Sequence, residues 1–179
     1  ISKKEISLVY LLGVDEIDMG YFGDAFVVYQ GHHGDIGAHR ADVVLPGAAY
    51  TEKTALYVNT EGRVQETRRA IFPPGQAMED WKAIAAVAEA VGKPLAYTTQ
   101  GGLRAKLIAQ FPHFAQLDML PAAAVPKNTV TGTATIKPER FDYPVMNFYM
   151  TDPISRASKT MAACTEAAAR TAQEKKKAA

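Results

Sequence analysis

Three short apolar runs stand out along the N-terminal part of the chain, with few polar residues inside them. They cover Glu5–Gly13, Ala25–Tyr29 and Ala41–Pro46. Continuous apolar runs of this length are typical of strands buried on both faces, as in a parallel sheet. Because the connections between the runs are short, the pattern predicts an α/β fold in which these strands form a short, buried and mainly parallel sheet.

The next segment carries the signals of a β-hairpin. Leu56–Val58 and Val64–Thr67 flank a polar turn, in which Gly62 can take the positive φ that tight turns require. The run Phe72–Gly75, with two prolines and a glycine, then breaks the chain. We therefore expect a hairpin to follow the sheet.

Two helices are expected beside this sheet. Apolar residues recur at spacings of three and four through Met78–Val91, and Gly92 is placed to end the helix. Trp81 starts the apolar face, so we expect its indole to be buried against the sheet. The stretch Leu103–Phe111 predicts a second, shorter helix.

The C-terminal third has a different character. The stretch 113–147 is interrupted by prolines and has no sustained period, so we expect an extended connector. Asp152 and Pro153 suit the first positions of a helix, and the alanine-rich run from Ile154 to Glu174 favours one. The predicted organisation has three parts: residues 1–112, the α/β part; residues 113–147, the connector; and residues 148–179, a helical segment with a basic tail.

Composition narrows the function classes. The formal charge of +1 argues against a nucleic-acid partner, and the apolar runs are too short to span a bilayer, so we expect no direct membrane insertion. The single cysteine, Cys164, excludes an internal disulfide. It also excludes a self-contained iron–sulfur cluster, which needs about four thiolate ligands.

The run "YQGHHGDIGAHR" is the first candidate site. On an extended segment His32 and His33 point to opposite sides, and the spacing from Asp35 to His39 needs a helix that Gly37 weakens. A metal site is therefore disfavoured, and Asp35 is expected to cap a short helical turn. The glycines at 31, 34 and 37 do not form the dinucleotide fingerprint, and no long helix follows them.

Other residues with chemistry-bearing side chains have simpler interpretations. They are the acidic pairs Glu61 and Glu66, and Glu79 and Asp80; the serines Ser155 and Ser158; and the arginines Arg63, Arg68 and Arg69. The acids suit a solvated hairpin turn and the first turn of a helix, the serines have no histidine nearby in sequence, and the arginines suit a solvated or partner-facing surface. We therefore predict no catalytic, cofactor-binding or metal-ligating residue in this chain.

Several motifs resemble a known family. "ADVVLPGAAYTEK" and "YVNTEGRVQ", followed by Trp81 after a proline–glycine break, resemble the molybdopterin oxidoreductase family. Within that family, "VYQGHHGDIGA" is similar to the branch of large iron–sulfur subunits of respiratory complex I. "FYMTDPISRASKTMAAC", residues 148–164, is similar to the C-terminal end of those subunits.

The resemblance implies a structural role. It implies that residues 1–112 are the C-terminal part of a molybdopterin oxidoreductase-like domain that has lost its cofactor and its catalysis. Because the iron–sulfur clusters of such subunits lie in an N-terminal half that is not present here, and the chain begins with Ile1, we expect a fragment or a split-gene product. The expected partners are that N-terminal half and the neighbouring matrix-arm subunits, on the matrix side of the mitochondrial inner membrane.

Two other functions stay open at this point. The chain could be part of an active molybdopterin-dependent oxidoreductase that still contacts the pterin. A free-standing nucleotide-binding module is the third reading, and the missing phosphate loop weakens it.

Overall fold

The computed structural model describes residues 5–120, 135, 138, 145 and 147–178. The chain divides into two compact units, Ile1–Ala122 and Ala123–Ala179. The sheet, the hairpin and the first three α-helices belong to the first unit, and the two C-terminal helices belong to the second.

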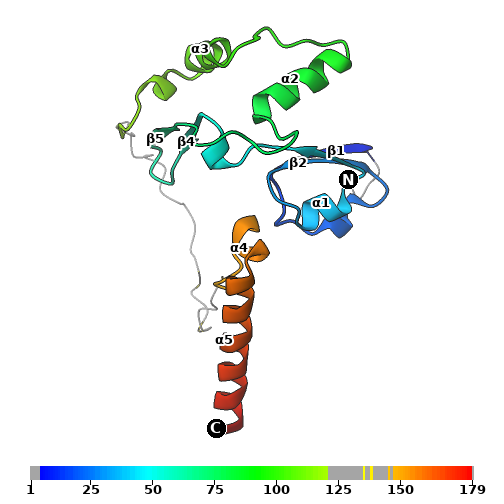
Figure 1. The fold of residues 1–179 in the computed structure, drawn as a ribbon, viewed down its shortest axis with the longest axis vertical. Coiled ribbons are helices and arrows are strands. Elements are labelled where there is room, and N and C mark those ends of the chain that lie inside the picture. Colours follow the sequence, from blue (N-terminus) through cyan, green and yellow to red (C-terminus); the bar gives the residue numbers. More distant parts are fainter. Residues whose placement is uncertain (1–4, 121–134, 136–137, 139–144, 146, 179) are drawn as a thin grey trace. The chain divides into compact units, whose positions relative to one another are not determined.

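The first unit contains a parallel sheet (Figure 1). Its strands are β1 (Leu8–Leu12), β2 (Phe26–Gly31) and β3 (Val43–Pro46), in the order β1–β2–β3. The 3-10 turn η1 (Met19–Phe22) lies between β1 and β2, and the short helix α1 (Ile36–Arg40) joins β2 to β3. The predicted α/β class and the parallel pairing are confirmed.

Both connections pack on the same face of the sheet. The core there consists of Leu11, Phe22, Val27 and Tyr29, each at most 3% exposed. Crossovers of the usual hand lie on one face when parallel strands follow the order of the chain. The position of this core therefore follows from the topology.

The opposite face of the sheet is largely uncovered. Leu8, Leu12 and Phe26 alternate with the core residues, and they are 56%, 48% and 47% exposed. Both valines of β3, Val43 and Val44, are exposed as well. The expectation that all three strands are buried on both faces is therefore wrong for the described residues. The apolar pattern records a face that needs cover, and these residues supply cover to one face.

The predicted hairpin is confirmed. Strands β4 (Ala55–Val58) and β5 (Val64–Thr67) pair antiparallel, and Gly62 has φ 85° in the turn between them. Asn59 Oδ1 accepts hydrogen bonds from the backbone N–H groups of Glu61 and Arg63, both at 3.0 Å. The asparagine and the glycine therefore fix the turn locally.

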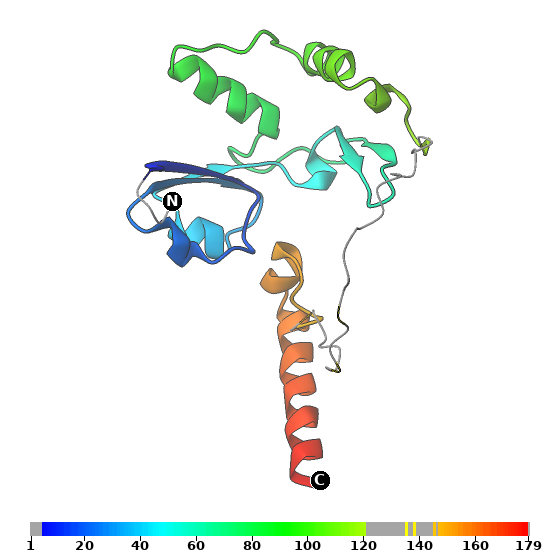
Figure 2. The same cartoon turned by 180° about the vertical axis from the view of Figure 1, so that it is seen from behind.

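Both predicted helices of the first unit are present. Helix α2 (Asp80–Ala90) begins two residues later than expected, and α3 (Gln100–Gln110) begins three residues earlier and lies alongside the hairpin (Figure 2). Gly92 has φ 73°, and its N–H and that of Lys93 bond to Glu89 O and Ala88 O, both at 2.9 Å. These two bonds form a Schellman motif, so the glycine ends α2 as predicted.

The face of α2 that is buried differs from the prediction. Trp81 is only half-buried; its Nε1 donates to Glu79 Oε2 at 3.1 Å, and its ring lies 6.5 Å from the ring of Tyr97. Ala83 is the buried residue of the helix, and Val91 is exposed. The expectation that Trp81 is buried against the sheet is therefore wrong, because alanines place apolar side chains on more than one face and spacing alone did not fix the phase.

The chain after α3 returns to the hairpin. Beyond the 3-10 turn η3 (Pro112–Ala115), Leu117 pairs with Val64 in an isolated β-bridge. Asp118 N–H donates to Val64 O at 2.8 Å, and Asp118 O accepts from the guanidinium of Arg63 at 2.6 Å. The start of the predicted connector is therefore bonded to the hairpin, while most of residues 113–147 lie outside the described residues.

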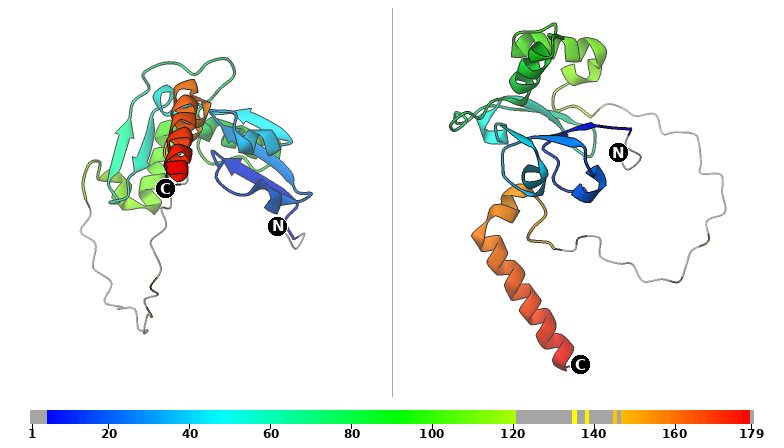
Figure 3. Two further views of the ribbon diagram at one scale, coloured as in Figure 1. Left: turned by 90° about the horizontal axis from the view of Figure 1, so that it is seen from below. Right: turned by 90° about the vertical axis from the view of Figure 1, so that its right-hand side faces the viewer.

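The second unit contains two helices, α4 (Pro153–Ala157) and α5 (Lys159–Ala178) (Figure 3). The single helix predicted from Ile154 to Glu174 is divided in two because Ser158 is extended, with ψ 122°. Asp152 caps α4 as predicted, since its Oδ1 accepts from the N–H groups of Ile154 and Ser155 at 2.9 and 3.0 Å.

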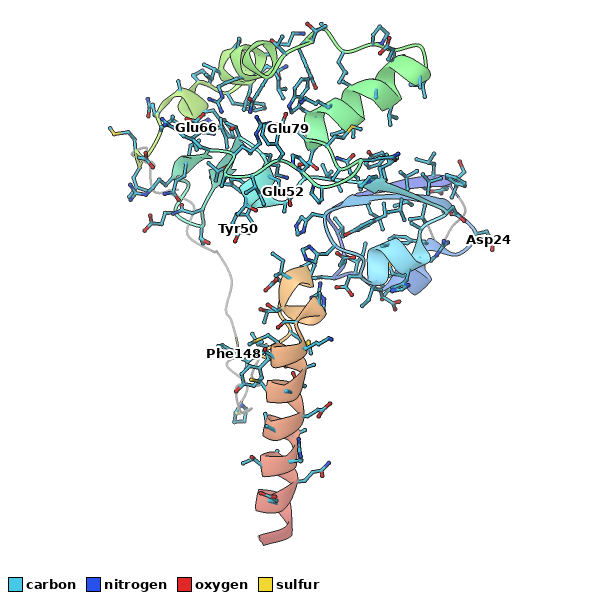
Figure 4. All side chains as sticks on the ribbon, viewed as in Figure 1. Asp24, Tyr50, Glu52, Glu66, Glu79 and Phe148 are labelled. Atoms are coloured by element: carbon cyan, nitrogen blue, oxygen red, sulfur yellow. The ribbon has the colours of Figure 1, made fainter. Side chains whose placement is uncertain are left out.

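The residues before α4 pack against the start of α5. Asn147 Nδ2 donates to Thr165 Oγ1 at 3.2 Å, and the rings of Phe148 and Tyr149 meet edge to face 5.7 Å apart. Phe148 lies beside the helix and remains mostly exposed (Figure 4). This small cluster ties the segment before the helices to α5.

Candidate functional site

A polar cluster lies at the carboxyl edge of the parallel sheet. Gln30, near the end of β2, is fully buried, and its Nε2 donates to Asp80 Oδ1 at 2.9 Å. Tyr10 donates its hydroxyl hydrogen to Gln30 Oε1, and Lys53 donates to Asp80 Oδ2. Ligands of α/β proteins bind outside the carboxyl ends of the strands, so this cluster is the candidate site.

Backbone pairing brings these distant residues together. After β3, Gly47 forms a parallel bridge with Met78, and Ala48 N–H donates to Met78 O at 2.8 Å. This pairing places Asp80, the first residue of α2, beside the end of β2. A Cβ added to Gly47 would lie 3.2 Å from Asp80 Oδ1, so a larger residue there would crowd the carboxylate.

A cavity of about 460 Å³ opens over the cluster. Besides Gln30, Lys53 and Asp80, its walls come from the strand ends and from the segment around η2 (Tyr50–Glu52): Leu12, Gly13, Gly31, His32, Tyr50 and Tyr57. Tyr50 and Glu52 project from η2, and Glu79 stands just before α2 (Figure 4). The walls are largely aromatic and aliphatic, and charge is supplied by Lys53 and Asp80.

The cluster perturbs two nearby side chains. Burial raises the pKa of Tyr10, and the negative charge of Asp80 raises it further. Burial lowers the pKa of His32, as do His33 and Lys53, while Asp80 and Glu52 oppose that shift. Both shifts favour the neutral form, so Tyr10 keeps its hydroxyl hydrogen and His32 is a neutral imidazole near neutral pH.

The two histidines meet instead of diverging. His32 Nδ1 and His33 Nδ1 lie 2.6 Å apart, and the rings are nearly perpendicular. The expectation that they point to opposite sides is wrong, because the chain bends immediately after β2. Within the ranges that the structure describes, no three His, Cys, Asp or Glu side chains gather closely enough to hold a metal ion.

The glycine run serves close packing. A Cβ at Gly31 would meet the Tyr29 ring at 2.5 to 2.7 Å, and one at Gly37 would meet Val14 O at 2.6 Å, whereas one at Gly34 would meet nothing within 4 Å. Asp35 occupies the N-cap position of α1, but its side chain makes no capping bond. Buried Asp15 takes that role, accepting from Gly37 N–H at 2.8 Å and from the Tyr29 hydroxyl at 2.9 Å.

The remaining candidates fall into two groups. Glu61 is exposed as expected, and Arg68 and Arg69 are exposed too. Glu66 pairs with Arg104, and Glu79 is buried and bonded to Trp81 and Lys82, so the solvated interpretation is wrong for these two acids. Asp80 is likewise held by Lys53 and Gln30.

The two serines cap helices. Ser155 Oγ donates to Asp152 Oδ2, and Ser158 Oγ accepts from Met161 N–H at 3.4 Å. Both serines therefore stabilise the start of a helix, which is the role expected of this residue type there. Their hydroxyls are engaged by a carboxylate and a backbone N–H, as helix caps are, and not in the manner of a serine nucleophile beside its base.

The sequence interpretation missed Tyr10, Gln30, Lys53 and Asp15. Gln30 did offer a signal, since it is a polar residue at the carboxyl end of an otherwise apolar strand. Asp15, two residues after the run Glu5–Gly13, occupies a comparable position. Lys53 offered none, because only the folded chain brings it to Asp80.

The chain belongs to the molybdopterin oxidoreductase family, whose model matches residues 1–90. A second family model, which describes a C-terminal region of NADH-ubiquinone oxidoreductase, matches residues 116–164. The family resemblance of the sequence motifs is therefore confirmed.

Curated relatives are more specific. The chain is 46% identical over 92% of its length to the NADH-ubiquinone oxidoreductase 75 kDa subunit of Reclinomonas americana. It is 49% and 44% identical, over 87% and 93% of its length, to the mitochondrial 78 kDa subunits of Candida albicans and Neurospora crassa. These matches cover 24%, 23% and 23% of the relatives, so the chain spans about a quarter of their length. None of the helices in the described part of the chain is long and apolar enough to cross a membrane.

The family name implies a pterin cofactor, and the candidate site does not fit one. The side chains of Gln30, Lys53 and Asp80 are bonded to one another and to Tyr10, so a pterin would have to break these bonds. The chain has no cysteine within residues 1–122 that could bind a metal through sulfur. The absence of cofactor-binding residues stays a prediction.

Proposed function

We propose that this chain is the C-terminal part of the large iron–sulfur subunit of respiratory complex I, and that its role there is structural. The observation that carries the proposal is the identity of 44–49% to 75 and 78 kDa subunits across 87–93% of the chain. Residues 1–112 then belong to the molybdopterin oxidoreductase-like domain, residues 113–147 connect, and residues 148–179 form a terminal helical segment.

The uncovered sheet face supports a role in assembly. Leu8, Leu12 and Phe26 are apolar side chains on one face, and parallel strands of this kind are normally covered on both faces. The proposed partners are the rest of the subunit and neighbouring matrix-arm subunits. Because relatives from two fungi are named mitochondrial, we place the assembly on the matrix side of the mitochondrial inner membrane.

The polar cluster supports the non-catalytic part of the proposal. Gln30, Lys53 and Asp80 are held by mutual bonds, so no side chain among them is poised as a nucleophile or a general base. In this proposal the subunit's iron–sulfur clusters lie outside this chain, and electrons pass from NADH to ubiquinone without using its side chains. Metal analysis of the purified assembly distinguishes the alternative, since about one molybdenum per complex would indicate an active pterin enzyme.

The histidine pair provides the sharper test. Changing His32 and His33 to glutamine in the assembled complex should leave NADH-to-ubiquinone turnover per assembled complex unchanged. His113→Gln, at an exposed histidine of η3, is the matched control. A tenfold loss of turnover at normal assembly, about 1.4 kcal/mol of barrier, would show that the pair takes part in the chemistry.

A further inference from the structure

A second surface of the first unit has the composition of a protein-binding site. The residues directly after β5, Arg68, Arg69, Ala70, Ile71 and Phe72, are all exposed. Phe72 is 78% exposed, the largest fraction among the exposed large apolar side chains of the described residues, and Ile71 is 58% exposed. Exposed aromatic and arginine side chains side by side are typical of the energetically dominant part of an interface.

Backbone bonds hold this segment in one conformation. The N–H groups of Ala70 and Ile71 donate to Thr51 O at 2.8 and 3.2 Å, and Arg69 N–H donates to Thr54 Oγ1 at 3.2 Å. The guanidinium of Arg69 lies over the Phe72 ring, 4.3 Å from its centroid. The phenyl ring is therefore presented by a preorganised segment, which lowers the entropy lost on binding.

The charge of the segment is uncompensated. In the described ranges, the ion pairs include Arg40, Lys53, Arg63, Lys82, Arg104 and Arg170 but neither Arg68 nor Arg69. Two guanidinium groups beside an exposed aromatic ring match a surface that offers an apolar pocket flanked by carboxylates.

We propose that Arg68–Phe72 is a docking surface for a separate subunit whose surface bears an apolar pocket with carboxylates beside it. This inference rests on the proposed function, which places the chain in a multi-subunit assembly. It differs from the uncovered sheet face, where Leu8, Leu12 and Phe26 offer apolar side chains without charge, as in a protein core. Arginine and aromatic side chains together are enriched where separately folded proteins meet.

Photo-cross-linking in the assembled complex tests the docking surface. The full-length subunit carries Phe72→p-benzoylphenylalanine, and the cross-linked peptides are identified by mass spectrometry. We expect a cross-link to another subunit, on a peptide with acidic residues next to the attachment point. Val91→p-benzoylphenylalanine, at a residue 67% exposed after α2, is the control and should not reach that peptide.

Charge variants complete the test. R68E/R69E should lower the yield of the Phe72 cross-link about tenfold, and R68K/R69K should retain most of it. A cross-link within the same polypeptide, a cross-link to a peptide without acidic residues, no cross-link, or a yield unaffected by charge reversal would each overturn the docking surface. The proposed function fails separately, if the full-length protein does not co-purify with NADH-ubiquinone oxidoreductase activity.

Discussion

Gly37→Ala should loosen the contact between α1 and the sheet. An added Cβ would lie 2.6 Å from Val14 O, 2.7 Å from Asp15 Oδ1 and 2.9 Å from Tyr29 Cδ2. These atoms belong to the backbone or to buried side chains, and Asp15 Oδ1 also accepts the Gly37 N–H bond. The methyl group therefore forces α1 away from the strand ends and weakens that bond.

The expected cost follows from two opposing contributions. Overpacking costs about 1–3 kcal/mol, and a hydrogen bond to a charged group contributes about 1.5–3 kcal/mol. Alanine returns up to about 1 kcal/mol through its higher helix propensity. We expect the free energy of local opening to fall by about 3 kcal/mol, which corresponds to roughly a hundredfold faster amide exchange.

Amide hydrogen exchange of residues 26–40, measured by mass spectrometry on the assembled complex, reports this opening. Gly34→Ala is the matched control, because a Cβ at Gly34 meets nothing within 4 Å. If the Gly37 and Gly34 variants exchanged equally, the close approach of α1 to the sheet would not be what requires glycine at position 37.

Two further predictions concern α2 and the candidate site. Trp81→Ala should cost about 2 kcal/mol, below the 3–5 kcal/mol of a buried tryptophan, as measured by amide exchange in α2, and Val91→Ala should change little. Asp80→Asn should lower the pKa of His32 and Lys53→Met should raise it, as measured by histidine hydrogen–deuterium exchange. Because folding lowers the pKa of His32 from 6.5, its contribution to stability is present above about pH 6.5 and is lost as pH falls through the folded value. Shifts of the opposite sign in the two variants would contradict the charge assignment.

Local rules account for the elements that the sequence predicted. Gly62 and Gly92 both have positive φ at the ends of regular segments, and Asp152 caps α4 through its neighbours' N–H groups. Each of these signals acts within a few residues. The three strands followed in the same way from continuous apolar runs, although the runs did not reveal which face would be covered.

The candidate site depends on contacts that no local rule contains. Gln30 and Asp80 are 50 residues apart in the sequence, and they meet because Gly47 pairs with Met78. Lys53 reaches Asp80 across 27 residues. The phase of α2 was misjudged for a related reason, since Ala83 and Trp81 both suit an apolar face and tertiary packing chose the alanine.

The strand order determines how the sheet gains its stability. Because β1, β2 and β3 are adjacent in chain order, η1 and α1 both cover the face that contains Leu11, Val27 and Tyr29. The face that contains Leu8 and Phe26 needs cover from other segments, since α2 reaches only the Gln30 end of it. A partner that binds this face in the folded state alone stabilises the sheet by mass action, whereas the α1 face contributes its stability within the chain. The free energy of unfolding of the sheet is therefore coupled to assembly, through apolar side chains that the described residues leave exposed.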